Sequence, residues 1–287
     1  MEINICNLFS GSKGNATYIG TDTEGILIDC GKPTQKVVDA LHSIGINPRQ
    51  IKALFVTHSH SDHIGYKGKS VKAFVEAFKI PLISAQPTID DIDQADNTRP
   101  LTMRYGVYVC ENEKNKFGNF GIETVEVYHD VTCQGIAITL PDKTKVGYLT
   151  DVARIEEDIF KTFKGCEYMI IESNYDPKML AESDRSDELK FRISNGEDGH
   201  ISNEECADFC VRLCESGTKH FMLAHLSEEC NTPKLAKEMF LKKMNEAGFE
   251  EGIDFTLDIC QQEDITVCNT DDLPIREIIN HDEPVAE

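Results

Sequence analysis

The chain has 287 residues, of which 40% are hydrophobic, and this is enough to bury the core of one compact domain. Its formal net charge of −21 at pH 7 excludes a general polyanion-binding surface, because a protein this acidic repels phosphate backbones at long range. No basic and apolar leader opens the sequence and no run of 18 apolar residues occurs, so we expect a cytoplasmic protein that does not enter a membrane.

Strands and helices are expected to alternate through the first half of the chain. A glycine-rich turn at residues 10–15 separates the first two apolar runs. Apolar residues at a period of 3.6 predict a helix that Thr34 caps and Gly45 ends, and a second helix whose apolar face runs from Val71 to Phe78. Strands are predicted at residues 3–9, 16–19, 25–28, 53–56 and 80–84. This alternation is typical of layered α/β folds.

The second half continues the pattern and ends in a tail. The last two predicted helices have clear starts, because Ser202 and Glu205 form a capping box and Thr232 precedes a proline at the first helical position. Strands are predicted at residues 123–128, 136–140, 145–149, 168–171 and 220–224, and helices near 154–164, 203–216 and 233–247. From residue 271 the chain turns acidic and loses its apolar period. We therefore expect one domain over 1–270 and a loosely packed acidic tail over 271–287.

Eleven cysteines, an odd number without tight pairs, are expected to be reduced in a chain that lacks a leader. Cys206, Cys210 and Cys214 share one face of a predicted helix with Phe209 and Leu213, which is the pattern of a core face. A thiolate metal site on the same helix is the alternative interpretation.

A histidine-rich motif follows the predicted strand at residues 53–56. It places three imidazoles and a carboxylate at the carboxyl end of the strand, where α/β sheets hold their sites. The four side chains belong to His58, His60, Asp62 and His63. Alternating His58 and His60 can face one ion while Asp62 and His63 face a second, provided that other segments complete each shell.

Three further candidates, His129, Asp151 and His225, also stand at or just beyond the ends of predicted strands. A core-packing role is least expected at such positions. The combined nitrogen and oxygen ligands, without a thiolate, suit two divalent ions of zinc, manganese or iron.

These residues resemble the five ordered motifs of the metallo-β-lactamase superfamily, whose fold is a four-layer αββα sandwich. The motifs consist of Asp29, the His58–His63 segment, His129, Asp151 and His225. Finer motifs are similar to those of the YycJ/WalJ/VicX family of exonucleases, over about residues 3 to 245. They are Ser10–Asn15, Thr57–His63, Glu172–Asn174, Gly199–Asn203, Ala224–Ser227 and Asn231–Pro233.

The resemblance implies a role for each candidate. His58, His60 and His129 would hold one metal ion, and Asp62, His63 and His225 the other. Asp151 would bridge the two ions, and Asp29 would orient the histidine segment from outside the ligand set. The implied reaction is phosphodiester hydrolysis by a water that two cations activate, with DNA as the substrate and degradation from the 5′ end. Asp62 is then also a catalytic candidate, and Ser12 and Asn15 are expected to contact the substrate.

His200 is a second catalytic candidate because it stands immediately before the helix that the capping box opens. A helix start is receptive to phosphate, and a flanking imidazole can give a proton to the leaving oxygen. Packing or exposure at the helix entry is the alternative.

Residues 66–79 carry a net charge of +3, from four lysines against Glu76. This stretch either follows a DNA backbone, with Lys67 and Lys69 in contact with substrate, or forms an ordinary solvated helix face.

Two other functions are compatible with the sequence. The same site can hydrolyse a small substrate, such as a cyclic or other phosphodiester or a thioester. The chain can also be a metal-stabilised regulatory module without activity, although a complete ligand set argues against this.

Overall fold

Two mixed β-sheets of seven strands each form the centre of the protein in the computed structural model, which describes residues 2–95, 107–109, 114–270 and 273. The first sheet has the order β14-β1-β2-β3-β4-β5-β6, with β1 (Ile3–Phe9), β2 (Ala16–Thr21), β3 (Gly25–Ile28), β4 (Ile51–Phe55), β5 (Leu82–Ser84), β6 (Val107–Val109) and β14 (Thr266–Val267). The second has the order β13-β12-β11-β10-β9-β8-β7, with β7 (Lys114–Phe117), β8 (Phe120–Val127), β9 (Cys133–Thr139), β10 (Lys145–Leu149), β11 (Tyr168–Glu172), β12 (His220–Ala224) and β13 (Thr256–Ile259).

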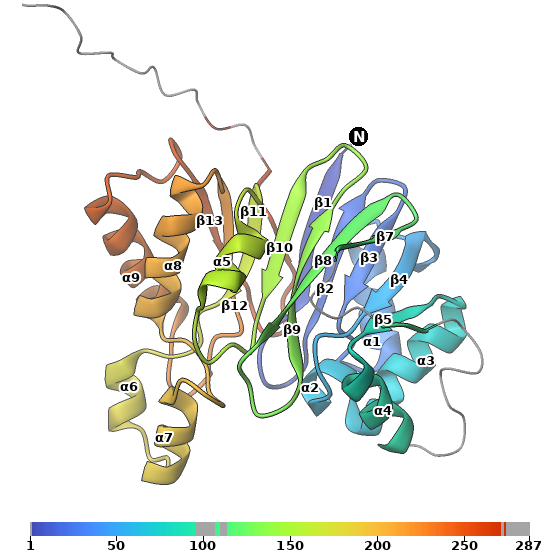
Figure 1. The fold of residues 1–287 in the computed structure, drawn as a ribbon, viewed down its shortest axis with the longest axis horizontal. Coiled ribbons are helices and arrows are strands. Elements are labelled where there is room, and N and C mark those ends of the chain that lie inside the picture. The colour runs from blue at the N-terminus through green and yellow to red at the C-terminus, as the bar shows by residue number, and fades with distance from the viewer. Residues whose placement is uncertain (1, 96–106, 110–113, 271–272, 274–287) are drawn as a thin grey trace, which may run out of the picture.

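Helices cover the outer face of each sheet (Figure 1). The first sheet packs against α1 (Thr34–Ser43), α3 (Lys69–Phe78) and α4 (Gln86–Ala95), with α2 (Ser61–Ile64) and the short 3-10 helices η1 (Pro48–Gln50) and η2 (Tyr66–Gly68) beside them. The second packs against α5 (Glu157–Phe163), α8 (Asn203–Glu215) and α9 (Pro233–Glu246). Two further helices, α6 (Pro177–Glu182) and α7 (Asp187–Ser194), lie at the same end of the molecule as α2 (Figure 1).

Three apolar cores separate the four layers. The core between the sheets includes Ile28, Phe55 and Met222, and each outer core joins one sheet to its helices. β3 reads Gly-Ile-Leu-Ile because it is buried on both faces, and such strands favour unbroken apolar runs. The predicted α/β architecture, a four-layer αββα sandwich, is therefore confirmed.

The cysteine stripe of α8 belongs to the outer core of the second sheet. Cys206, Cys210 and Cys214 are buried there beside Phe209 and Leu213, so the core interpretation holds. The ten cysteines in the described part of the chain are all free and buried.

The predicted element bounds differ from the observed ones in places, each with a physical reason. Thr34 does not cap α1, because Pro33 occupies the cap position and the Thr34 hydroxyl donates to the carbonyl oxygen of Ser70, at 3.1 Å. The segment near 154–164 becomes helical only from Glu157, since Arg154 reaches instead to the carbonyl oxygen of Gly196, at 2.9 Å. The capping box of Ser202 and the N-cap at Thr232 are present as predicted.

Several short elements were not predicted, namely α2, α4, α6, α7, β6, β7, β13 and β14. α6 and α7 share a small separate core made by Tyr175, Leu180, Ile193 and Cys230, which is too small to leave a strong apolar period in the sequence. Apart from residue 273, the predicted tail at 271–287 lies outside the described residues. None of the described helices has both the length and the apolar character of a membrane span.

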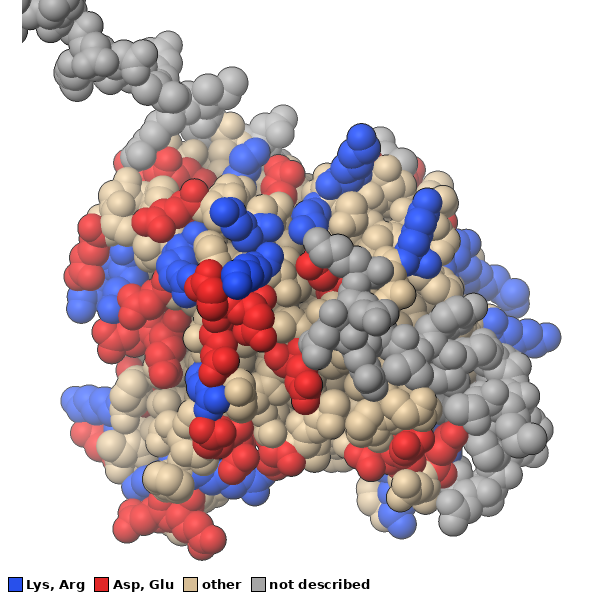
Figure 2. Space-filling model, viewed as in Figure 1, with Lys and Arg blue, Asp and Glu red and all other residues tan. Residues whose placement is uncertain are grey.

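Charged side chains are mixed on the face shown in Figure 2, where the basic residues over α5 are bordered by acidic ones. This view contains no broad basic area, in keeping with the net charge of −21.

Candidate metal centre

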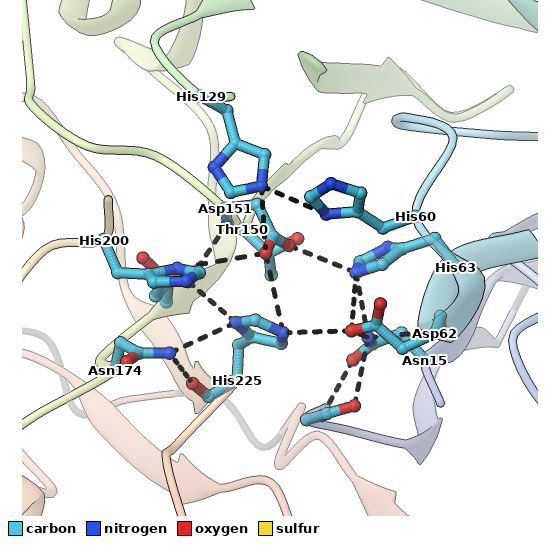
Figure 3. A network of polar contacts seen from close by, with 12 residues as sticks. Asn15, His60, Asp62, His63, His129, Thr150, Asp151, Asn174, His200 and His225 are labelled. Carbon is cyan, nitrogen blue, oxygen red and sulfur yellow. Dashed lines mark hydrogen bonds and ion pairs between the residues drawn. The ribbon is translucent and has the colours of Figure 1, made fainter. Parts of the chain in front are cut away.

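The seven residues predicted to bind metal meet where strand ends of both sheets converge. Figure 3 shows how His60, Asp62, His63, His129, Asp151 and His225 point toward one another. His58, His60, Asp62 and His63 follow β4 and enter α2, whereas His129, Asp151 and His225 follow β8, β10 and β12. Their candidate ligand atoms form overlapping groups in which all atoms lie within 4.8 Å of one another. The groups are His58–His60–His129, His58–His63–Asp151, Asp62–His63–His225 and Asp151–Glu172–His200–His225.

Backbone conformation helps to aim three of the side chains. Asp29, Asp151 and His225 have φ angles of 59°, 58° and 53°, in the left-handed region that non-glycine residues seldom adopt. Each residue stands one or two positions beyond a strand, so the unusual backbone turns its side chain toward the neighbouring strand ends. Such conformations persist only where the surroundings impose them, and they concentrate at functional sites.

The first cluster consists of His58, His60 and His129. Nε2 of His129 lies 3.4 Å from Nδ1 of His60. Burial is the main cause that lowers the pKa of His58 and of His129, so both rings are neutral at pH 7 and carry a lone pair. Nε2 of His58 is buried without a hydrogen-bond partner in the described chain, which is costly unless a ligand satisfies it.

The second cluster consists of Asp62, His63 and His225. Oδ2 of Asp62 lies 3.5 Å from Nε2 of His63 and 3.8 Å from Nε2 of His225. Nε2 of His225 is another buried atom for which no described residue provides a hydrogen bond. Burial opposes ionisation of Asp62, but the neighbouring His63 and His225 outweigh it and hold its pKa below the usual range. The carboxylate is therefore ionised.

Asp151 lies between the two clusters. Its Oδ2 is 3.2 Å from Nε2 of His63, and its Oδ1 is 3.6 Å from Nε2 of His225 and 3.9 Å from Nε2 of His129. Burial would raise the pKa of Asp151, yet His225 and His63 lower it well below the usual range. An ionised carboxylate that contacts histidines of both clusters, beside buried imidazole nitrogens that lack partners in the described chain, fits two divalent cations.

Asp29 contacts the His63 ring at Nδ1, the nitrogen that faces away from the cluster, as expected for a residue that orients a histidine. Its Oδ2 lies 2.7 Å from Nδ1 of His63, and its Oδ1 accepts a hydrogen bond from the backbone of Thr57, at 2.8 Å. This arrangement leaves Nε2 of His63 toward the cluster.

Glu172 orients two histidines by contacting the Nδ1 atom of each ring. It was not predicted as a site residue. Its Oε2 lies 2.8 Å from Nδ1 of His225 and 2.9 Å from Nδ1 of His200, and accepts from the backbone of Asp151, at 3.1 Å. The available signal was an acidic residue at the end of the apolar strand β11, inside a motif already quoted for its resemblance. Asp130 was also missed, and its Oδ1 lies 3.2 Å from Nε2 of His60.

His200 lies beside the two clusters and is mostly buried. Its side chain is 21% exposed and lines a cavity of about 220 Å³ together with residues of both clusters. The centroid of the His200 ring lies 5.5 Å from the ring centroids of His129 and of His225. Figure 3 shows the three rings side by side. Because Glu172 engages Nδ1, Nε2 is the ring nitrogen left for another partner.

The four expected substrate contacts fall in different places. Ser12 lines the cavity. Asn15 is buried and does not line it, because its Nδ2 lies 3.0 Å from Nε2 of His63 and its Oδ1 accepts from the backbone of Gly11. Lys67 and Lys69 are not among the residues that line the cavity. Both are exposed, with each Nζ 5.6 Å from the centre of the Tyr66 ring.

Gly31→Ala is expected to lower the free energy of unfolding by about 3 kcal/mol and to weaken metal binding. A Cβ at Gly31 would overlap the backbone carbonyl of Asp62, and the backbone of Gly31 donates to Asn15 at 2.9 Å, so α2 must move away from Gly31. Urea unfolding and a metal titration measure the two effects. Gly196→Ala is the matched control, since its Cβ would approach Arg154 no closer than 3.7 Å. Equal stability of the two variants would contradict the tight packing at Gly31.

Comparison with known proteins shows what this chain is similar to. Residues 10–136 match the family described as the metallo-beta-lactamase superfamily. The chain is 28% identical over 249 residues to the exodeoxyribonuclease WalJ of Streptococcus pneumoniae, covering 86% of this chain and 90% of that protein. It is also 28% identical over 257 residues to the exodeoxyribonuclease YycJ of Bacillus anthracis, covering 90% and 95%.

The fold is also similar to a solved structure. The metallo-beta-lactamase fold protein YhfI of Bacillus subtilis superposes with a TM-score of 0.65 at 15% identity, covering 93% of this chain and all of that one. With its two sheets, flanking helices and buried His and Asp clusters, the chain has the metallo-beta-lactamase fold.

Proposed function

We propose that this chain is a two-metal phosphodiester hydrolase that degrades DNA as an exonuclease from the 5′ end. The observation that carries the proposal is Asp151, whose carboxylate contacts both clusters of one buried centre, at 3.2 Å from Nε2 of His63 and 3.9 Å from Nε2 of His129. The DNA specificity is supported by the WalJ and YycJ relatives, which are named exodeoxyribonucleases and match over nearly their whole length. The 5′ polarity rests on the motifs shared with that family.

In this proposal His58, His60 and His129 would hold one cation and Asp62, His63 and His225 the other, with Asp151 available to both. When bound, two cations would supply a water of lowered pKa and offset the negative charge that grows on the phosphate oxygens.

The protein's own groups then orient the reaction. Glu172 holds Nδ1 of His200, so that Nε2 can give a proton to the leaving oxygen. Asp29 fixes the ring of His63, and Ser12 lines the cavity that receives the substrate.

The test is to incubate the purified protein, with Mn²⁺ or Zn²⁺, with single- and double-stranded DNA labelled at either end. Bis-p-nitrophenyl phosphate serves as a small diester beside it. We expect a 5′ label to be released first as a mononucleotide and a 3′ label to pass through a ladder of shortened strands. EDTA should stop both reactions.

Other outcomes assign the site differently. Turnover of the small diester, with DNA left intact across metals and salt concentrations, would contradict the nuclease assignment and favour a small-substrate hydrolase. Two bound metals without turnover of either substrate would favour the regulatory module.

A further inference from the structure

One wall of the cavity is built by α7 and the residue two positions before it. Arg185, Leu189, Arg192 and Ile193 line this wall. Leu189, Arg192 and Ile193 lie on one side of α7, and Arg185 precedes the helix. Leu189 is 38% exposed although it is apolar. The wall therefore presents one exposed apolar side chain and two guanidinium groups beside the candidate metal centre.

The two arginines are the only Lys or Arg side chains among the described residues that line the cavity. Each holds a carboxylate: Nε of Arg185 lies 3.0 Å from Glu229, and Nη2 of Arg192 lies 2.7 Å from Asp130. The Glu229 side chain is 68% exposed, and surface ion pairs of this kind contribute little to stability. A phosphate, which a guanidinium can bind through two parallel hydrogen bonds, can displace such a partner.

α7 has other anchors besides these ion pairs. Ile193 anchors the helix in the small core with Tyr175, Leu180 and Cys230. Ser186 caps its first turn by accepting from the backbone of Leu189, at 3.3 Å. The arginines are thus available for another task.

We propose that Arg185 and Arg192 bind a phosphate group of the substrate other than the one that is cleaved. The proposal rests on the proposed phosphodiesterase function, because the metal centre takes the scissile phosphate in that scheme. A second phosphate subsite selects a nucleic-acid strand over a small diester, which carries only one phosphate. Leu189 on the same wall gives an apolar contact for the sugar that joins the two phosphates.

The first experiment measures binding of a fluorescein-labelled, single-stranded phosphorothioate oligonucleotide to the metal-loaded protein, by anisotropy, as the NaCl concentration rises. Each phosphate contact on a single strand contributes about 0.7 to the slope of log affinity against log salt. The double variant Arg185→Gln/Arg192→Gln is expected to reduce that slope by about 0.7, and each single variant by a smaller amount, because the two arginines share one phosphate. Arg212→Gln is the matched control, because Arg212 lies on α8 in a similar exposed ion pair, 2.9 Å from Glu157, and should leave the slope unchanged.

The second experiment compares two substrates. Each cavity variant should lower kcat/KM on DNA relative to kcat/KM on bis-p-nitrophenyl phosphate by about tenfold, as loss of a hydrogen bond to a charged group implies. Metal content is measured in parallel, since Arg192 is linked to His60 through Asp130.

A third variant tests whether removal of a competing carboxylate increases the affinity for DNA. Glu229→Gln frees Arg185 from its carboxylate, so DNA should bind about two- to threefold more tightly. Glu157→Gln, which frees Arg212, should have no effect. An increase in affinity cannot come from misfolding.

Unchanged salt slopes, or equal losses on both substrates, would assign the arginines a structural role and overturn the second phosphate subsite. Failure of the proposed function is distinguishable, because in that case the wild-type protein itself leaves DNA intact.

Discussion

Asp151→Asn is expected to reduce turnover by about 10³-fold or more and to remove at least one of two bound metal ions per chain. The carboxylate lies between the two clusters, 3.2 Å from His63 and 3.9 Å from His129, and is ionised. Asparagine has the same shape and tolerates the left-handed backbone conformation at this position, where φ is 58°. The variant therefore removes the charge without adding backbone strain.

Mass spectrometric metal analysis and kinetics on one preparation check this prediction. The wild-type protein should hold two ions per chain in metal-replete buffer, and a value of one or less would contradict the two-metal centre. Asp142→Asn, in an exposed turn, controls for the substitution itself. Loss of a single ion from the Asp151 variant with a normal rate would show that the carboxylate does not join the two sites.

His200→Ala is expected to keep both metals and to lower turnover on DNA by roughly 10²-fold, the usual scale for loss of a proton donor. Glu172 holds Nδ1 of His200 at 2.9 Å, and the ring lines the cavity beside both clusters. The effect should be much smaller on bis-p-nitrophenyl phosphate, because p-nitrophenolate leaves without needing a proton. This difference separates proton donation from positioning.

His42→Ala, on the exposed surface of α1, is the control for loss of a histidine. Equal losses on both substrates would mean that His200 positions other groups rather than donating a proton. Unchanged turnover would show that His200 has no role in the reaction. Loss of a metal ion would show that His200 is a metal ligand.

Local sequence determined much of the fold and of the candidate site. The apolar runs of β3, β4, β10 and β12 follow from burial of the sheets, and α8 and α9 begin where their capping residues predict. The residues immediately beyond those strands were identifiable as candidates because the carboxyl end of a strand is where a sheet exposes side chains to a shared site.

Only the tertiary structure decided which side chains meet. Glu172 reads as an acidic residue at the end of a strand, and its contacts with His200 and His225 come from residues 28 and 53 positions away. The same holds for the arginine wall, since α7 has only a small core of its own and a weak apolar period. Lys67 and Lys69 follow the histidine motif closely, yet the backbone of η2 directs them to the surface beside Tyr66.

The physical reason for this difference is that the interactions that form single elements are local in sequence, whereas those that assemble the site are not. Strand and helix propensity, capping and apolar period act over a few residues and can be read along the chain. Convergence of a site depends on sheet order and on backbone turns such as those at Asp29, Asp151 and His225, which the packing of distant strands imposes.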